Sequence, residues 1–223
     1  MSTVPGTSSY LVSLGEAIVS ELEEAHKARE RGLTACRRVI RASSLAIRAV
    51  HRELPEEYRK RIDEAEGTLR EAQKELGPYP QIAHAGFLHD AEKEYAEARL
   101  TVCLVEGNEL KSYEQLGVGI AAWLNGLAEA ASELRRYILD RLRRGELDHA
   151  EMLLRQMEDC YEFLIGIDYP DALTGGLRRT TDGLRAVLER TRGDVTTTMI
   201  QSRLQHLLEE SIDRFSRTQV RDT

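Results

Sequence analysis

The sequence predicts an all-α protein, and three observations lead to this fold class. Ala, Leu, Glu and Arg, which favour helices, dominate a chain in which 31% of residues are charged and only 5% are aromatic. Proline is rare, with 5 among 223 residues. No segment alternates β-branched and polar residues as a half-buried strand does. Apolar residues instead recur with the helical period between Gly and Pro breakers, so we predict one bundle of seven helices.

The N-terminal third divides into a tail and two helices. Residues 1–13 are rich in Gly, Ser, Thr and Pro without periodicity, so we expect a flexible tail before a helical domain at 14–223. The first helix is expected at 14–53, and its apolar line contains Cys36, Val39, Ile40, Ile47, Val50 and Leu54. A second helix is expected from Pro55, a residue suited to the first helical position, to Leu76.

Five further helices follow the Gly-Pro-Tyr-Pro breaker at 77–80. They are expected at 81–105, at 120–144, at 147–165, in a segment that ends near 192, and at 195–217. Gly145 suits the end of the second of these five helices, and Gly193 suits the end of the fourth. Asp194 suits the N-cap of the last helix.

Charge and cysteine content narrow the functional classes. The net charge is −7, yet His26 to Arg61 holds eleven Lys or Arg against four Glu, a local charge of +7. Such an uneven distribution is compatible with nucleic-acid binding despite the acidic total. The three cysteines lack a CxxC pattern, and the N-terminus lacks the features of a signal peptide. No apolar run approaches 18 residues, so we expect a cytoplasmic protein with no membrane segment.

One face of the expected first helix is basic. Its members are Arg37, Arg38, Arg41, Arg48 and Arg52. At 100° per residue, all of these except Arg38 fall within about 60° of one another. Arginine stays charged and binds phosphate through two parallel hydrogen bonds, which makes this stripe a candidate nucleic-acid surface. A solvated face that pairs with acids of a neighbouring helix gives the same pattern, and both interpretations stay open here.

Two pairs of glutamates define the candidate catalytic and metal site. They are Glu94 and Glu97 in DAEKEYAEARL, and Glu129 and Glu133 in LNGLAEAASELRR. Spacings of three and four residues place both carboxylates of a pair on one helix face. If the pairs face each other, four carboxylates meet and need a cation or shared protons. Their oxygen ligands suit Mg²⁺ or Mn²⁺, which indicates a metal-dependent phosphate-ester hydrolase. A Glu-rich surface helix is the alternative interpretation.

Other chemistries find little support in the sequence. We find no GxSxG motif and no Cys–His arrangement, and the Gly-Gly-Leu-Arg-Arg run at 175–179 lacks the Lys-Ser/Thr of a phosphate-binding loop. The Glu-x-x-His pairs of di-iron bundles are also missing, which favours Mg²⁺ or Mn²⁺ over iron.

Four segments carry a resemblance to a known family. They are IRASSLAIRAVHR (40–52), AGFLHDAEKEYAEARL (85–100), LGVGIAAWLNGLAEAASELRR (116–136) and YPDALTGGLRRTTDGLRAVLERTRGD (169–194). In these segments the chain resembles the translin family, and within it the prokaryotic members of the branch of translin-associated factor X. The resemblance extends over nearly the whole chain after the expected tail.

The resemblance implies a seven-helix subunit that assembles into a hollow homo-oligomer, typically an octamer. It also implies that single-stranded RNA or DNA binds an inner basic surface, here the five arginines. The X-type subunits of the family are Mg²⁺-dependent endoribonucleases with catalytic carboxylates in EYxEA and GxADxxxEL motifs. These motifs correspond here to Glu94 and Glu97, and to Glu129 and Glu133. Glu129 stands where animal members carry Asp, which lengthens the side chain by one methylene and keeps its oxygen donors.

The sequence and the resemblance together predict a Mg²⁺-dependent endoribonuclease that cleaves single-stranded RNA inside an oligomeric cage. Two alternatives remain. One is a non-catalytic single-strand-binding protein of the translin type. The other is an all-α nucleoside triphosphate pyrophosphatase, which also uses carboxylate pairs with Mg²⁺.

Overall fold

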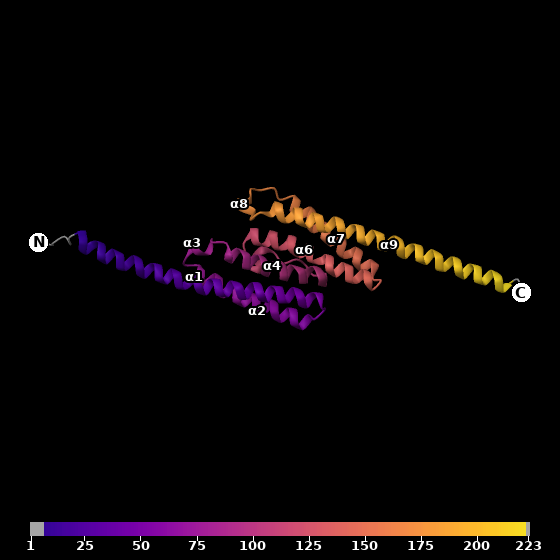
Figure 1. The fold of residues 1–223 in the computed structure, drawn as a ribbon, viewed down its shortest axis with the longest axis horizontal. Coiled ribbons are helices and arrows are strands. Elements are labelled where there is room, and N and C mark those ends of the chain that lie inside the picture. The colour runs from indigo at the N-terminus through magenta and orange to yellow at the C-terminus, as the bar shows by residue number, and fades with distance from the viewer. Residues whose placement is uncertain (1–6, 222–223) are drawn as a thin grey trace. The chain divides into compact units, whose positions relative to one another are not determined.

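The computed structural model describes residues 7–221, and within that range it describes the side chains of 9–212 and of Arg214. The described chain is built from helices and contains no strand, which confirms the predicted all-α class. The helices are α1 (Thr7–His51), α2 (Pro55–Leu76), α3 (Pro80–Ala83), α4 (Phe87–Glu106), α5 (Tyr113–Leu116), α6 (Ile120–Arg143), α7 (Leu147–Ile165), α8 (Asp171–Thr174) and α9 (Leu177–Arg221) (Figure 1). No described helix is long and apolar enough to cross a lipid bilayer.

Several helix ends agree with the prediction. The expected ranges Pro55–Leu76 and Leu147–Ile165 are those of α2 and α7, and α6 ends one residue before the expected limit. By contrast, α1 begins at Thr7, so residues 7–13 of the expected tail are helical, and residues 1–6 lie outside the described part. Gly86, with a φ of +95°, separates the short α3 from α4, which therefore starts later than expected.

The two last predicted helices are one continuous helix, α9, so the predicted break at Gly193 is wrong. Gly193 lies inside the continuous range of α9 and does not adopt a positive φ. The hydroxyl of Thr198 donates to the carbonyl of Asp194, as it does one turn along a helix. The Asp194 carboxylate accepts from Arg135 at 2.9 Å instead of capping a helix. A glycine inside a helix costs about 1 kcal/mol, and burial of Val195, two residues further on, opposes that cost.

The described chain forms two compact units. The first contains the residues up to Ala98 together with Tyr113–Trp123, and it is built around the hairpin of α1 and α2. Small residues such as Cys36 and Ala46 line the buried face of α1, and α2 buries larger side chains such as Tyr58, Ile62 and Leu69. The part of α1 before Ala28 runs past the end of α2 toward the N-terminus (Figure 1). Most of that part is exposed to solvent.

The second unit contains Arg99–Ser112 and the residues from Leu124 onward. Buried apolar side chains of α7 and α9 form its core, among them Leu153, Met157 and Leu184. The guanidinium of Arg192 on α9 donates to one carboxylate oxygen of Glu158 on α7 at 2.9 and 2.7 Å. The last turns of α9 extend beyond α7 (Figure 1).

Asn125 fixes α8 and the start of α9 within the second unit. Its amide nitrogen donates to the carbonyl of Thr174 at 2.8 Å, and its amide oxygen accepts from the hydroxyl of Thr180 at 2.6 Å. Asn125 is only 2% exposed. A buried amide is stable when its donor and acceptor both have partners, and these contacts supply them.

Two glycines inside helices of the first unit differ in the space around them, one being crowded and the other open. This difference predicts opposite effects of alanine substitution on stability. A Cβ at Gly32 on α1 would lie 2.6 Å from a methyl carbon of the buried Leu76, whereas a Cβ at Gly67 on α2 would have no neighbour within 4 Å. We expect Gly32→Ala to lower the free energy of unfolding by about 1–2 kcal/mol, since overpacking outweighs the gain in helix propensity. Gly67→Ala should raise it by up to about 1 kcal/mol. Chemical denaturation of the two variants measures both signs.

The buried cysteines give a second prediction. Burial, with the nearby carboxylates of Glu92 and Asp90, raises the pKa of the Cys36 thiol to about 11. Burial, with Asp159, raises the pKa of Cys160 to about 12. Because thiolate is the reactive form, native alkylation at pH 8 should be at least about 100-fold slower than in the unfolded chain.

The same shifts have a defined sign for stability. A raised folded pKa means that the folded state keeps protons that the unfolded state loses above about pH 9. The stability contribution of these thiols is therefore full below pH 9 and declines between about pH 9 and 12. Denaturation curves recorded across that range test the decline. A Cys36→Ala/Cys160→Ala variant is the control, and it should lose stability less steeply with rising pH.

Candidate functional site

Helix α4 carries the first acidic pair on a largely buried helix. Ala96 and Ala98 are fully buried and Tyr95 is 1% exposed, so this stretch of α4 is packed on several sides. Glu97 lies within it and is only 8% exposed. Glu94 is partly buried, and its carboxylate lies 3.6 Å from the ammonium of Lys93. Burying an ionised carboxylate is costly unless cations or hydrogen-bond donors compensate, so a buried glutamate here is consistent with a functional role.

Helix α6 carries the second pair beside a surface of small residues. Ala122, Gly126 and Ala130 are buried on this helix. Glu129 and Glu133 are both partly buried. Small side chains leave the space that a ligand or another backbone needs for a close approach.

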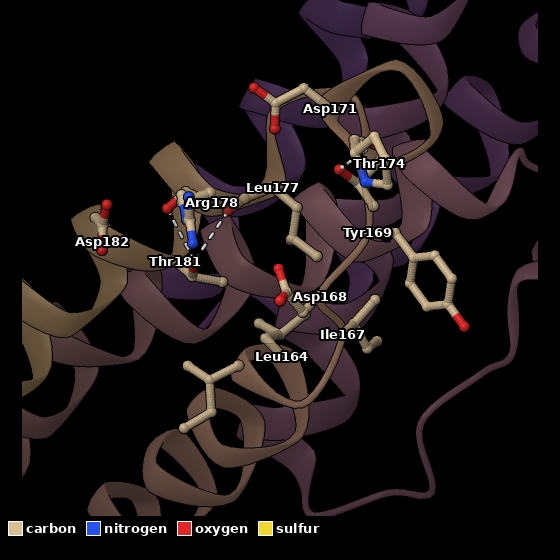
Figure 2. Close-up of a pocket in the computed structure, with 12 residues that line it drawn as sticks. Leu164, Ile167, Asp168, Tyr169, Asp171, Thr174, Leu177, Arg178, Thr181 and Asp182 are labelled. Atoms are coloured by element: carbon tan, nitrogen blue, oxygen red, sulfur yellow. Dashed lines mark hydrogen bonds between the residues drawn. The ribbon is translucent and has the colours of Figure 1, made fainter.

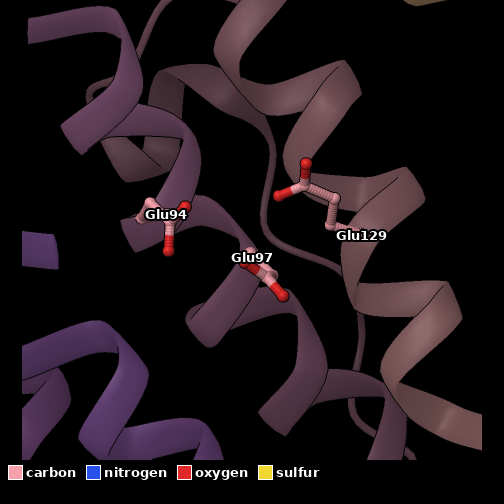
Figure 3. Close-up of side chains that lie close together, drawn as sticks. All are labelled: Glu94, Glu97 and Glu129. Carbon is pink, nitrogen blue, oxygen red and sulfur yellow. The ribbon is translucent and has the colours of Figure 1, made fainter. Parts of the chain in front are cut away.

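The structure brings three of the four predicted carboxylates together. One carboxylate oxygen from each of Glu94, Glu97 and Glu129 lies within 4.8 Å of the other two (Figure 3). Glu133 does not belong to this group. It lines a groove of about 660 Å³ with Ser132, Arg135, Arg136, Leu139, Asp140, Arg143 and Val187. The described side chains therefore supply three grouped oxygen donors and a fourth carboxylate one turn further along α6.

The three grouped donors fit a small divalent cation. Mg²⁺ takes six oxygen ligands at about 2.1 Å, which places opposite ligands about 4.2 Å apart. The spread of up to 4.8 Å among the three oxygens is close to that span, and small side-chain rotations bring them within it. All the donors are carboxylate oxygens, which suit Mg²⁺ or Mn²⁺ rather than a metal that prefers thiolate or imidazole.

The five predicted arginines all lie on the exposed side of α1, in the first unit. Arg37, Arg38, Arg41, Arg48 and Arg52 are exposed. Within the part of the chain that the structure describes, no carboxylate is paired with any of them. Other basic residues on α1 differ, since Lys27 pairs with Glu24, Arg29 with Glu30 and Arg31 with Glu75. The structure thus disfavours the interpretation of the arginine stripe as one side of a set of ion pairs.

Arg38 stands apart from the other four arginines. It lines a groove of about 470 Å³ along α1 and α2, together with the acidic residues Glu30, Glu71 and Glu75. Acidic neighbours lower the local affinity for phosphate. The structure therefore favours Arg37, Arg41, Arg48 and Arg52 as the basic surface and gives Arg38 a marginal place.

A cavity lies elsewhere, at the corner where α7, α8 and α9 meet. It has a volume of about 760 Å³, and none of the predicted site residues lines it. Figure 2 shows Asp168 and Tyr169 on the connection that follows α7, and Thr181 on α9, where its hydroxyl donates to the carbonyls of Leu177 and Arg178. The acidic side chains on its rim make it a poor phosphate site.

Sequence patterns did not identify the hydrogen bonds that the Glu92 carboxylate accepts. The carboxylate of Glu92 on α4 accepts from the backbone N–H of Gly119 at 3.0 Å and from the side-chain amide of Gln73 at 2.8 Å. These residues lie far apart in the sequence and form no motif. The available signal was the pair of glycines at 117 and 119, directly before α6.

The chain is similar to several solved structures. The crystal structure of AfC3PO, from Archaeoglobus, matches with a TM-score of 0.77 and 34% identity, covering 83% of this chain and 97% of that one. The AfC3PO–duplex RNA complex gives a TM-score of 0.73 and 33% identity, covering 83% and 96%. The apo-NeC3PO crystal structure, from Neurospora, shares the fold with a TM-score of 0.74 and 22% identity, covering 89% and 100%.

Sequence comparisons add one relative of unknown function. An uncharacterized protein of Methanocaldococcus jannaschii, MJ0175, is 28% identical over 182 residues, which cover 81% of this chain and 80% of that protein. No family model matches the chain.

Fold and site define an all-α protein with a carboxylate-rich candidate metal centre and a separate basic helix face. With the AfC3PO match, the chain belongs to the translin family and is TRAX-like within it.

Proposed function

We propose that this protein is a Mg²⁺-dependent endoribonuclease that binds and cleaves single-stranded RNA. The observation that carries the proposal is the grouping of Glu94, Glu97 and Glu129, because three nearby carboxylates favour a divalent cation. Glu133 is proposed as a fourth catalytic residue that completes the ligand set from the next turn of α6. Mn²⁺ should substitute for Mg²⁺, since both are hard cations that take oxygen ligands.

RNA as the substrate class rests on two further observations. The AfC3PO relative has been solved with a duplex RNA, which supports RNA as a ligand of this family member. The exposed arginines of α1 supply unpaired positive charge for a phosphate backbone. Single strands remain our proposed substrate because a flexible strand can follow a basic surface without sequence preference.

The chemistry divides between the two sets of residues. Arg37, Arg41, Arg48 and Arg52 hold the phosphate backbone with contacts that do not depend on base sequence. The glutamates would hold the cation beside the phosphodiester to be cleaved. A bound divalent ion supplies Lewis acidity for attack by water and for departure of the leaving oxygen. Removing the ion leaves the carboxylates close together, where they repel phosphate.

We also propose self-association as a homo-oligomer, with an octamer as the expected size. Two helix segments expose rows of large apolar side chains. On α1 these are Tyr10, Leu11, Leu14, Ile18 and Leu22, which are 40–63% exposed. On α9 they are Ile200, Leu204, Leu207, Leu208 and Ile212, which are 53–64% exposed. Rows of this length are unfavourable in water, which supports their burial against other subunits.

The proposal is tested with purified protein and an end-labelled single-stranded RNA, in Mg²⁺, in Mn²⁺ and in excess EDTA. A matched DNA strand and an RNA duplex of equal length are assayed in parallel. We expect cleavage of the single-stranded RNA with either metal and none in EDTA. Binding without cleavage in every condition would instead support a non-catalytic RNA- or DNA-binding protein. Release of pyrophosphate from free nucleoside triphosphates, with intact RNA, would support the pyrophosphatase alternative.

A further inference from the structure

We infer that Glu92 is a positioning residue that holds the start of α6 against α4 and α2, and thereby sets where Glu129 presents its carboxylate. The inference rests on the proposed function, because it gives Glu92 a role toward the metal site. Glu92 is not among the grouped carboxylates and is not proposed as a ligand.

Both oxygens of Glu92 are used in contacts to different elements. Oε1 accepts from the side-chain amide of Gln73 on α2 at 2.8 Å. Oε2 accepts from the backbone N–H of Gly119 at 3.0 Å. The same amide of Gln73 also donates to the carbonyl of Gly117 at 2.8 Å. Three segments that are distant in the sequence are thus joined by one carboxylate and one amide, all within the first unit.

The contact to Gly119 works as a helix cap supplied from another helix. The first N–H groups of a helix lack partners within that helix, and its N-terminus carries partial positive charge. Gly119 has no side chain with which to cap α6, and the first turn of α6 has no acidic residue. The Glu92 carboxylate meets both needs, and a charge-assisted hydrogen bond of this kind is stronger than a neutral one. The cap therefore determines where α6 begins.

The loop sequence is matched to this contact. A Cβ at Gly119 would lie 3.3 Å from Oε2 of Glu92, which is tighter than an ordinary contact. Gly117 has a φ of +65°, a conformation that favours glycine. Its carbonyl accepts the hydrogen bond from the side-chain amide of Gln73. The two glycines therefore permit the approach that Glu92 and Gln73 require.

The two elements joined by the cap each carry part of the carboxylate group. Glu92 shares α4 with Glu94 and Glu97, and Gly119 directly precedes α6, which carries Glu129. At 1.5 Å per residue, Glu129 lies about 15 Å along the helix from the cap. A helix transmits an axial shift of its first turn over such a length with little loss. A displacement of about 1 Å at a metal or catalytic site lowers function by up to about 100-fold.

The test compares Glu92→Ala, Glu92→Gln and Gly119→Ala with wild type in the full-length chain. Glu75→Ala is the matched control, because Glu75 is also a carboxylate that joins two helices of the first unit, here through Arg31, but does not touch α6. Two quantities are measured. The first is amide hydrogen exchange of residues 119–123 without metal. The second is Mn²⁺ affinity by titration calorimetry.

We expect Glu92→Ala to speed exchange of these amides at least about tenfold and to weaken Mn²⁺ binding about 10- to 100-fold. Glu92→Gln keeps one acceptor oxygen and should be intermediate, and Gly119→Ala should change both quantities in the same direction as Glu92→Ala. Glu75→Ala should leave both near wild type.

Each contrary result has a separate meaning. Unchanged exchange in Glu92→Ala would refute the cap, whatever the metal does. Faster exchange with Mn²⁺ affinity equal to that of Glu75→Ala would refute its link to the site. If wild type binds no Mn²⁺, the proposed function fails and the link falls with it, while exchange still decides the cap.

Discussion

Replacement of Glu129 by Ala is expected to abolish metal-dependent RNA cleavage while RNA binding stays within about twofold of wild type. Glu129 is the member of the carboxylate group that α6 contributes. Its loss removes one of three grouped oxygen donors, and loss of a metal ligand typically costs several kcal/mol of transition-state stabilisation. A decrease in turnover of at least about 1,000-fold is therefore expected. Single-turnover cleavage and a separate binding isotherm in Ca²⁺ measure the two quantities.

Two further variants make this prediction specific. Glu129→Asp keeps the carboxylate on a shorter side chain and should retain part of the activity, because the oxygen donors survive and only the geometry changes. Glu151→Ala removes a carboxylate that pairs with Arg155 on α7 and is not among the grouped residues, so this variant should cleave like wild type. Full activity in Glu129→Ala, or equal losses in Glu129→Ala and Glu151→Ala, would count against the carboxylate group as the catalytic centre.

The second large effect is expected on the basic face of α1. Substituting Arg37, Arg41, Arg48 and Arg52 together with Gln should weaken RNA binding about 100- to 1,000-fold at moderate salt. Each lost phosphate contact lowers the salt dependence of the binding constant by about 0.7 for a single strand, so the slope of log K against log salt should fall by about 3. Fluorescence anisotropy at several salt concentrations measures both.

The chain offers a control of similar chemistry on the same helix. Arg29 and Arg31 are paired with Glu30 and Glu75, so their charges are already compensated. Substituting both with Gln should leave affinity and salt slope close to wild type. If this double variant loses as much RNA affinity per substituted residue as the fourfold variant, then net charge, and not the unpaired arginine stripe, governs RNA binding.

Proline and glycine positions in the sequence correctly predicted several helix limits. Pro55 begins α2, and a left-handed Gly145 follows the end of α6. The same rule was wrong at Gly193, because a glycine permits a helix end but does not impose one, and Gly193 keeps a helical backbone within α9. The helical start at Thr7 was also missed, since Gly-, Ser- and Thr-rich sequence has low helix propensity and gives no periodic signal.

Part of the candidate site could also be predicted from local sequence patterns, and part could not. Helical spacing placed Glu94 and Glu97 on one face, and it did the same for Glu129 and Glu133. Spacing could not tell which oxygens approach one another, so the separation of Glu133 from the group emerged only from the structure. The contacts of Glu92 could not be predicted from the sequence for a related reason. They join residues 73, 92 and 119 through a single side chain and leave no periodic pattern.

The carboxylate group as a divalent metal site is the centre of this account, and anomalous diffraction from crystals soaked in Mn²⁺ tests it most directly. We predict a strong anomalous peak about 2.2 Å from carboxylate oxygens of Glu94, Glu97 and Glu129, and no such peak in crystals of Glu129→Ala soaked in the same way. Peaks confined to other carboxylates, or no peak at Mn²⁺ concentrations that support cleavage, would contradict it.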